Sequence, residues 1–287
     1  MTDQIIQSAN LPLCVTKETC TGGTYIVTGA NTGLGYEAAK HLVSLGASKV
    51  VLAVRNITLG AKAKAEIEAA TGTSNIAEVW ELDLASYDSV KSFAKKAITE
   101  LDRIDALIEN AGVAAGTRVL AEGHLINITV NVLSTLLLAV LLLPKMSESA
   151  KKFGILPHLA IVSSGASFAM EADWNTIKDD PLVGIEREDL PAMKTYPLSK
   201  LLEIFGVYYL ATLIPVSHTG VVVNLVDPGL CNTELSKDAP PPLRQHILEM
   251  QAKVGRTPEV GSRTLLHGAI AGKESHGALL QSCEISE

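Results

Sequence analysis

The stretch TGANTGLG, residues 28–35, lies between an apolar run of strand length and a segment with helical spacing. Its glycines Gly29, Gly33 and Gly35 allow a backbone to approach a pyrophosphate, and the helix that follows supplies free N–H groups and a positive dipole. The spacing is GxxxGxG rather than GxGxxG. Such a turn can simply need positive φ, but its place between a strand and a helix favours a dinucleotide site.

Strand-length apolar runs alternate with helical segments along the rest of the chain. Strands are expected at residues 24–30, 49–56, 77–84, 104–112, 158–164 and 220–229, and helices at residues 36–47, 59–72, 88–103, 132–143 and 199–214. Strands that are apolar throughout are typical of a parallel sheet covered on both faces. The pattern predicts one doubly wound α/β domain of the Rossmann type over residues 24–287, preceded by an N-terminal arm at residues 1–23.

The composition excludes several classes of function. A net charge of −7 without a basic stripe argues against nucleic-acid binding. The four cysteines form no CxxC pair and have no ligand spacing with the seven histidines, so no metal site is expected. No signal peptide is expected at the N-terminus, and a cytoplasmic location is predicted. The apolar run at residues 132–144 is about half a membrane span in length, so we interpret it as a core or subunit-contact helix.

Arg55 indicates which dinucleotide would bind. It stands twenty residues after Gly35, at the end of the second expected strand, where an NAD site usually has an acidic residue for the ribose 2′-hydroxyl. A guanidinium instead matches a 2′-phosphate in charge and geometry. The sequence therefore predicts NADP(H) rather than NAD(H), and a solvated arginine at a strand end is the alternative.

The stretch YPLSK, residues 196–200, raises the question of proton transfer. Tyr196 and Lys200 are four residues apart, so on a helix they share one face. Such a pair is common on any helix. A phenol with an ordinary pKa of about 10 is also a poor acid near neutral pH, and lowering that pKa by about three units requires about 4 kcal/mol. A lysine ammonium one turn away acts in that direction.

Five motifs together resemble the short-chain dehydrogenase/reductase family. They are TGANTGLG, NAG at residues 110–112, VSS at 162–164, YPLSK, and DPG at 227–229. The resemblance extends from about residue 24 to about residue 233. The long gap between the serine and the tyrosine, with SKLLEIF after it, is similar to the retinol-dehydrogenase-like subgroup and its fungal secondary-metabolism relatives.

The resemblance implies a set of site residues. Together with Arg55, the residues expected at the cofactor are Gly29, Asn31, Gly33, Leu34, Gly35, Asp83, Asn110, Ala111, Gly112, Tyr196, Lys200, Pro228, Gly229, Leu230 and Thr233. The residues expected to be catalytic are Ser164, Tyr196, Lys200 and Asn131, with Ser163 as the alternative serine. In this scheme Asp83 contacts the adenine ring, and Asn131 holds a water near the lysine.

The sequence departs from the family pattern at three positions. Glu109 and Asp227 stand where asparagine is common, and Pro197 directly follows the tyrosine. Because proline is tolerated in the first turn of a helix, this helix is expected to begin very near Tyr196. A further C-terminal segment is also expected after SCEISE.

Two segments are expected to border the substrate: a flap at residues 168–193 and a lid around residues 230–255. Met170, Trp174, Leu230 and Leu235 could line an apolar pocket there, or could be ordinary loop packing. The hypothesis is an NADP(H)-dependent oxidoreductase that interconverts a ketone or aldehyde and an alcohol on a bulky lipophilic molecule, such as a secondary-metabolite intermediate.

Two alternatives remain open: a non-redox isomerase or cyclase that uses bound NADP(H), and a non-catalytic nucleotide-binding sensor. The resemblance also suggests a homo-oligomer, a dimer or tetramer built on the long apolar helix, although the same apolar stripe could be core.

Overall fold

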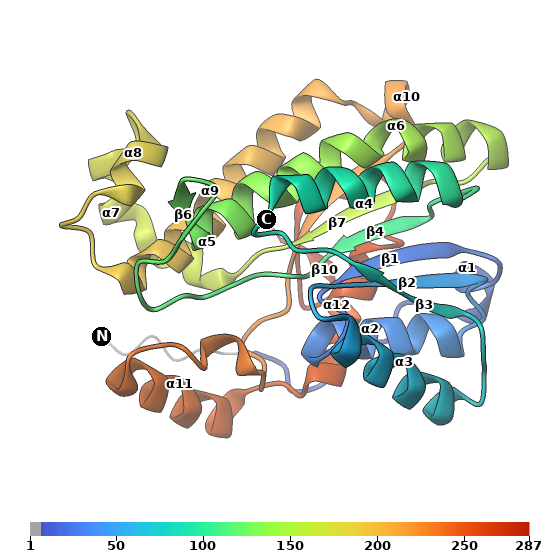
Figure 1. Cartoon of the computed structure of the whole chain (residues 1–287), viewed down its shortest axis with the longest axis horizontal. Helices are drawn as coiled ribbons and strands as arrows, with labels where there is room; N and C mark the ends of the chain where they lie inside the picture. The colour runs from blue at the N-terminus through green and yellow to red at the C-terminus, as the bar shows by residue number, and fades with distance from the viewer. Residues whose placement is uncertain (1–6, 287) are drawn as a thin grey trace.

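The structure, a computed structural model, describes residues 7–286 and is built on an eight-stranded sheet (Figure 1). The strand order is β10-β9-β8-β7-β4-β1-β2-β3, and all neighbours are parallel except β9 and β10. The strands are β1 (Thr24–Thr28), β2 (Lys49–Val54), β3 (Ala77–Glu81), β4 (Ala106–Glu109), β7 (His158–Val162), β8 (Val222–Asp227), β9 (Leu279–Gln281) and β10 (Glu284–Ile285). This confirms the predicted fold class.

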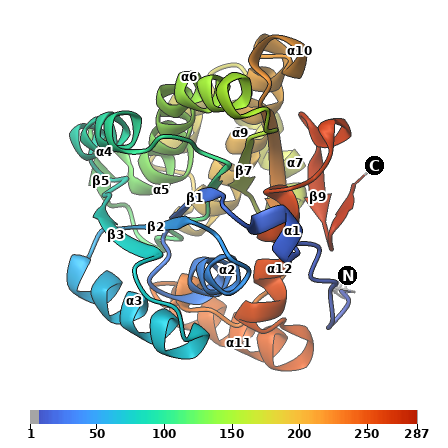
Figure 2. The same ribbon diagram turned by 90° about the vertical axis from the view of Figure 1, so that its right-hand side faces the viewer.

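Helices cover both faces of the sheet (Figure 2). One face carries α2 (Gly33–Ser44), α3 (Ile57–Thr71) and α12 (Pro258–Gly268), and the other carries α4 (Tyr87–Glu100), α6 (Thr135–Phe153) and α9 (Ala192–Leu213). Helix α12 and strands β9 and β10 lie beyond the elements that the sequence predicted. The smaller elements are α1 (Lys17–Cys20), β5 (Leu120–Ala121), β6 (His124–Leu125), α5 (Ile126–Ile128), the π-helix η1 (Thr129–Ser134), the 3-10 helix η2 (Gly165–Met170), α7 (Glu171–Ile177), α8 (Pro181–Glu186), α10 (Val216–Thr219), η3 (Glu234–Ser236), α11 (Pro241–Val254) and η4 (Lys273–Ser275).

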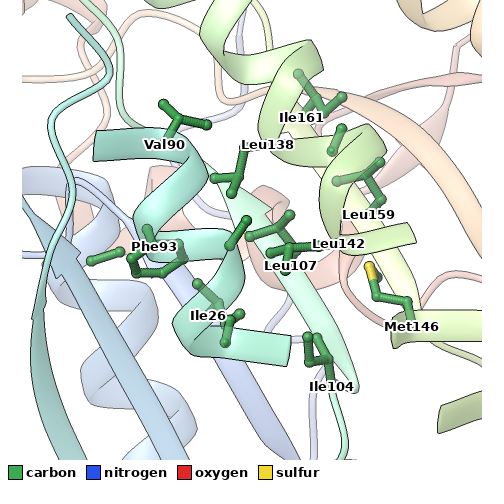
Figure 3. Close-up of a cluster of buried hydrophobic side chains, with 14 of the residues drawn as sticks. Ile26, Val90, Phe93, Ile104, Leu107, Leu138, Leu142, Met146, Leu159 and Ile161 are labelled. Atoms are coloured by element: carbon green, nitrogen blue, oxygen red, sulfur yellow. The ribbon is translucent and has the colours of Figure 1, made fainter. Parts of the chain in front are cut away.

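The larger core cluster lies under α4 and α6. Figure 3 shows Phe93 of α4, Leu107 of β4 and Leu142 of α6 meeting between the sheet and the helices. Leu107 and Leu142 have no exposed surface. Burying a side chain of this size contributes about 1.5–3 kcal/mol, so this interface holds β4 and β7 in place below the site.

The segment Ile126–Phe153 is continuous helix, and by length and composition it could cross a membrane. Most of it is buried in the core, including Leu138 and Leu142, so it is the core helix that the sequence interpretation favoured. It is longer than predicted because it continues through Pro144. Pro144 and Val140 are exposed, so the carbonyl that loses its amide partner lies on the outer side of the helix.

The prediction that the tyrosine helix begins near Tyr196 is wrong. Helix α9 begins at Ala192, and Pro197 lies inside it, past the first turn. Tertiary contacts anchor the turn that precedes Pro197. The Thr195 hydroxyl donates to the Ala192 carbonyl at 2.7 Å and accepts from the Asn127 amide at 2.6 Å, which anchors the first turn to α5.

The core assignment predicts a contrast on helix α6. Leu142→Ala should lower the free energy of unfolding by about 2–5 kcal/mol, because it leaves a cavity in the cluster. Val140→Ala, on the exposed side of the same helix, should change it by about 0.5 kcal/mol or less. Denaturant unfolding monitored by circular dichroism measures both, and equal losses would contradict the assignment.

Candidate active site

The carboxyl ends of β1 and β4 form the point where the winding of the sheet reverses. Chain connections lead from β1 toward β2 on one side, and from β4 toward β7 on the other. The Asn110 amide donates to the Thr28 carbonyl at 2.9 Å, and the Ala111 N–H donates to the Thr28 hydroxyl at 2.9 Å. These bonds hold the predicted glycine turn against the NAG segment. In open α/β sheets, ligands bind at this switch point.

The glycine turn lacks room for side chains. Gly29 and Gly33 have φ of +66° and +60°. A Cβ at Gly35 would lie 2.5 Å from Asn110 Nδ2 and 2.7 Å from the Gly29 carbonyl oxygen. Thr32 precedes α2 and its side chain makes no capping bond, so within residues 7–286 it leaves the first N–H groups of that helix available to an anion. These features fit the pyrophosphate of a dinucleotide.

The other residues predicted to bind the phosphates and the adenosine side lie around this turn. Arg55 is exposed just after β2, and Asn31 is partly buried in the turn. Asp83 follows β3 and uses one carboxylate oxygen to accept from the Ala85 N–H at 2.9 Å. Leu34 packs toward α12, where a Cβ at Gly261 would lie 2.6 Å from its side chain.

The PGL segment, residues 228–230, follows β8 and lies across the cofactor crevice from the glycine turn. Gly229 has a φ of +73°, and its N–H donates to Asp227 at 3.0 Å. The Gln7 side chain donates to the Leu230 carbonyl at 2.8 Å and accepts from the Leu230 N–H at 2.9 Å. A Cβ at Gly33 would lie 3.6 Å from the Thr233 methyl group, so this segment closes over the glycine turn.

Arg256 holds the same segment from behind. Its buried guanidinium donates to the Pro228 carbonyl at 2.8 Å, the Ser8 carbonyl at 2.9 Å and the Ser282 hydroxyl at 2.8 Å. Sequence reasoning missed Arg256 and Gln7, because neither belongs to a motif. The signal available for Arg256 was only its position before the Thr257 cap of α12.

Tyr196 of α9 and Ser164, the second residue after β7, lie close enough for their hydroxyl groups to interact. Burial raises the pKa of Tyr196, while the Lys200 ammonium and the Ser164 hydroxyl act to lower it. Ser163 points elsewhere: its hydroxyl donates to the Lys200 carbonyl at 3.4 Å inside the protein. This geometry favours Ser164 over Ser163 for contact with a substrate.

Lys200 is almost completely buried, and its ammonium is paired. It donates to the Val162 carbonyl at 2.7 Å and to the Glu203 carboxylate at 2.9 and 3.1 Å. Sequence reasoning missed Glu203. The signal was an acidic residue in the apolar stretch SKLLEIF, three positions after Lys200, which places both on one helical face.

Asn131 is fully buried in the π-helical turn η1. Its carboxamide accepts from the Val113 N–H at 2.9 Å and donates to the Val113 carbonyl at 2.9 Å and the Ser199 hydroxyl at 3.0 Å. A Cβ at Gly112 would lie 3.3 Å from Asn131 Oδ1 and 3.9 Å from Lys200 Nζ. Asn131 therefore joins the NAG segment to the tyrosine helix beside the lysine, as π-turns at functional sites often do.

Comparison with known proteins identifies the family. The sequence profile described as short chain dehydrogenase matches residues 24–175. The chain belongs to the short-chain dehydrogenase family. The short chain dehydrogenase/reductase dmxR8 of Cryptosporiopsis sp. is 44% identical over 92% of this chain and 82% of its own length. The short-chain dehydrogenase anuD of Penicillium roqueforti is 36% identical over 93% of this chain and 70% of its own.

Solved structures have the same fold as this dehydrogenase. A short chain dehydrogenase from Escherichia coli complexed with NADPH superposes with a TM-score of 0.69 at 20% identity, covering 93% of this chain and 99% of its own. One from Shigella flexneri complexed with NADP has a TM-score of 0.66 at 19% identity, with the same coverage. Membership of this family makes the protein an oxidoreductase that uses a nicotinamide cofactor.

The close packing of the turn predicts a steric block. Gly35→Ala should weaken NADPH binding at least about tenfold, because the new methyl group pushes Asn110 and the Gly29 carbonyl apart. Ser44→Ala, at the exposed end of the same helix, should leave the affinity unchanged. Titration of NADPH fluorescence measures both affinities. Wild-type affinity in Gly35→Ala would contradict the assignment of the glycine turn to the cofactor phosphates.

Proposed function

We propose that this dehydrogenase uses NADP(H) to interconvert a ketone or aldehyde and an alcohol on a bulky lipophilic small molecule, with Tyr196 as the acid or base. The observation that carries the proposal is the convergence of Ser164, Tyr196 and Lys200, from the two motifs VSS and YPLSK, beside the carboxyl end of β7. The bound nicotinamide supplies or accepts the hydride. A proton must then move to or from the substrate oxygen.

Four side chains of this protein have separate roles in that proton transfer. The Tyr196 O–H donates to the substrate oxygen in reduction, and the phenolate takes the proton back in oxidation. Ser164 holds the same oxygen and shares the charge that develops on it. Burial alone would leave Tyr196 a weak acid, so the positive charge of Lys200 has to offset part of that cost. Asn131 fixes the position of the lysine helix through Ser199.

The preference for NADP(H) rests on Arg55. It is exposed at the carboxyl end of β2, where a 2′-phosphate on the adenosine ribose can reach it, and no acidic residue adjoins it in sequence. The fold neighbours with NADPH and NADP support this choice. Gly29, Asn31, Gly33, Leu34 and Gly35 would hold the phosphates, and Asp83, Asn110, Ala111 and Gly112 the adenosine side.

A lipophilic substrate would enter between the segments that follow β7 and β8. Figure 1 shows α7 and α8 at the same end of the molecule as α11. Residues 230–255 would act as the lid, with the exposed Leu235 and Leu248 toward the substrate. Met170 and Trp174 pack against a buried hydrophobic cluster that includes Ile177, so they stabilise the flap at residues 168–193. Because the relatives are fungal short-chain dehydrogenases, we further propose a secondary-metabolite intermediate as substrate.

Assembly and location follow as smaller proposals. Residues Tyr208 and Leu213 on α9, and Phe153 on α6, present exposed apolar side chains that suit contact with a second copy of the chain. The apolar helix is largely buried in the core, and we propose a cytoplasmic enzyme.

The acid role of Tyr196 predicts a split between binding and turnover. Tyr196→Phe should bind NADPH within about twofold of wild type, yet lose at least a hundredfold in kcat, because it removes the proton donor. Tyr209→Phe, exposed on the same helix, is the matched control and should retain both. NADPH consumption and alcohol formation against a panel of bulky ketones measure the rates. Product without NADPH oxidation would favour an isomerase or cyclase.

The cofactor choice has its own variant. Arg55→Asp should shift the ratio of kcat/KM for NADPH over NADH by about tenfold or more toward NADH, because a carboxylate repels a 2′-phosphate and accepts from a 2′-hydroxyl. Lys62→Asp makes the same charge change on exposed α3 and should leave the ratio near wild type. An unchanged ratio in Arg55→Asp would remove Arg55 from the cofactor site.

A further inference from the structure

The hydrogen-bond partners of the Lys200 ammonium point to a further role for Glu203. An ammonium has three N–H donors. The Val162 carbonyl takes one, and the Glu203 carboxylate lies within 2.9 and 3.1 Å of the same nitrogen. Glu203 is only 1% exposed, so this is a buried ion pair rather than a surface contact. This ion pair holds Lys200 Nζ close to Asn131 and to the backbone of Gly112.

Glu203 also changes the charge that Tyr196 experiences. The carboxylate raises the pKa of Tyr196, in the opposite direction to Lys200 on the same helix. Asp227, from β8, raises it as well, but that carboxylate is bonded to the Gly229 N–H and the Gln281 amide. While Glu203 is ionised, it therefore offsets part of the effect that the positive charge of Lys200 has on the tyrosine.

The remaining carboxyl group nearby is Glu109 at the end of β4. Neither of its oxygens has a hydrogen-bond partner within residues 7–286, and burial raises its pKa well above the ordinary value. A buried carboxyl group without a bonded partner is unfavourable in its charged form. Burial also raises the pKa of Glu203, to about 7, although Lys200 and the Ser163 hydroxyl act in the opposite direction. Glu203 is the carboxyl group of this cluster that pairs with the lysine.

We propose that Glu203 is a positioning residue for Lys200, and that its charge sets the pH at which the Tyr196–Lys200 pair gives up its first proton. The inference rests on the proposed function, since it concerns the same proton transfer. It goes further by assigning Glu203 as a counter-ion, which reduces the effect of the Lys200 charge on the pKa of Tyr196.

The direction of the effect follows from charge alone. The first proton leaves either the Tyr196 O–H or the Lys200 ammonium, and the two share one apparent titration. A carboxylate beside them opposes either loss, so a neutral residue in its place makes the loss easier. Above about pH 7 wild-type Glu203 is charged, so the electrostatic difference between the wild type and a variant with a neutral residue at position 203 is greatest. Below that pH wild-type Glu203 takes up a proton and the difference disappears.

The deciding experiment uses Glu203→Gln, which retains an acceptor for the ammonium but removes the charge. We expect the pH profiles of kcat/KM for ketone reduction and alcohol oxidation both to move to lower pH, by about one unit or more. Titration of tyrosinate absorbance in the NADP⁺ complex, with Tyr196→Phe subtracted, should show the same shift. The substrate is the ketone of the panel that wild type reduces fastest.

Two variants separate this role from a merely structural one. Glu203→Asp keeps the charge and should restore the wild-type position of the profile, even if its rate is lower. Glu109→Gln alters a neighbouring buried carboxyl group that has no bond to Lys200, and should leave the profile within about 0.3 unit of wild type. Thermal melting measures the stability of each variant.

Coincident wild-type and Glu203→Gln titrations in both measurements would overturn the inference, whatever the loss of rate or of stability. This result is distinguishable from failure of the proposed function. Substantial turnover by Tyr196→Phe would remove the acid role itself. Loss of turnover in Tyr196→Phe together with an unmoved Glu203→Gln profile would remove only the part assigned to Glu203.

Discussion

The hydrogen bonds at Thr28 are the constraint on which the cofactor crevice depends. Its carbonyl and hydroxyl accept from Asn110 and Ala111, so the ends of β1 and β4 are joined side by side at the switch point. Parallel strands alone would bring these ends to the same edge of the sheet, but would not fix the two loops against each other. With the loops joined, there is no space for a side chain at Gly35, and the backbone itself forms the wall of the crevice.

A second constraint acts deeper in the site, where Lys200 is buried. A buried ammonium without acceptors is very unfavourable, so the Val162 carbonyl and the Glu203 carboxylate are conditions for its presence there. The same pairing weakens the positive potential that the lysine exerts on Tyr196. Stability of the buried charge and acidity of the phenol therefore oppose each other. The distribution of charge among Lys200, Glu203 and Tyr196 balances these two requirements.

Much of the fold was predictable because strands and helices alternate with clear periodicity. The glycine turn, the NAG segment and the YPLSK pair also lie where their motifs place them relative to the sheet. The start of α9 was not predictable from local rules, because the Asn127–Thr195 bond that anchors the turn before the proline joins residues far apart in the sequence. The roles of Gln7, Arg256 and Glu203 were harder to find, although Glu203 left a signal as an acidic residue in an apolar stretch. Each acts through a contact made only after distant segments pack, or through burial that a single sequence does not display.

Arg256 joins segments that are far apart in the chain. Its guanidinium contacts Ser8 and Ser282 as well as Pro228, so the loop at the nicotinamide end is supported from both extremes of the described sequence. Contacts of such long sequence separation form late in folding. During synthesis the sheet from β1 to β8 can assemble before Ser282 has left the ribosome, but the support for the PGL segment cannot. A nascent chain of this enzyme should therefore acquire its Rossmann core before it acquires a finished binding loop.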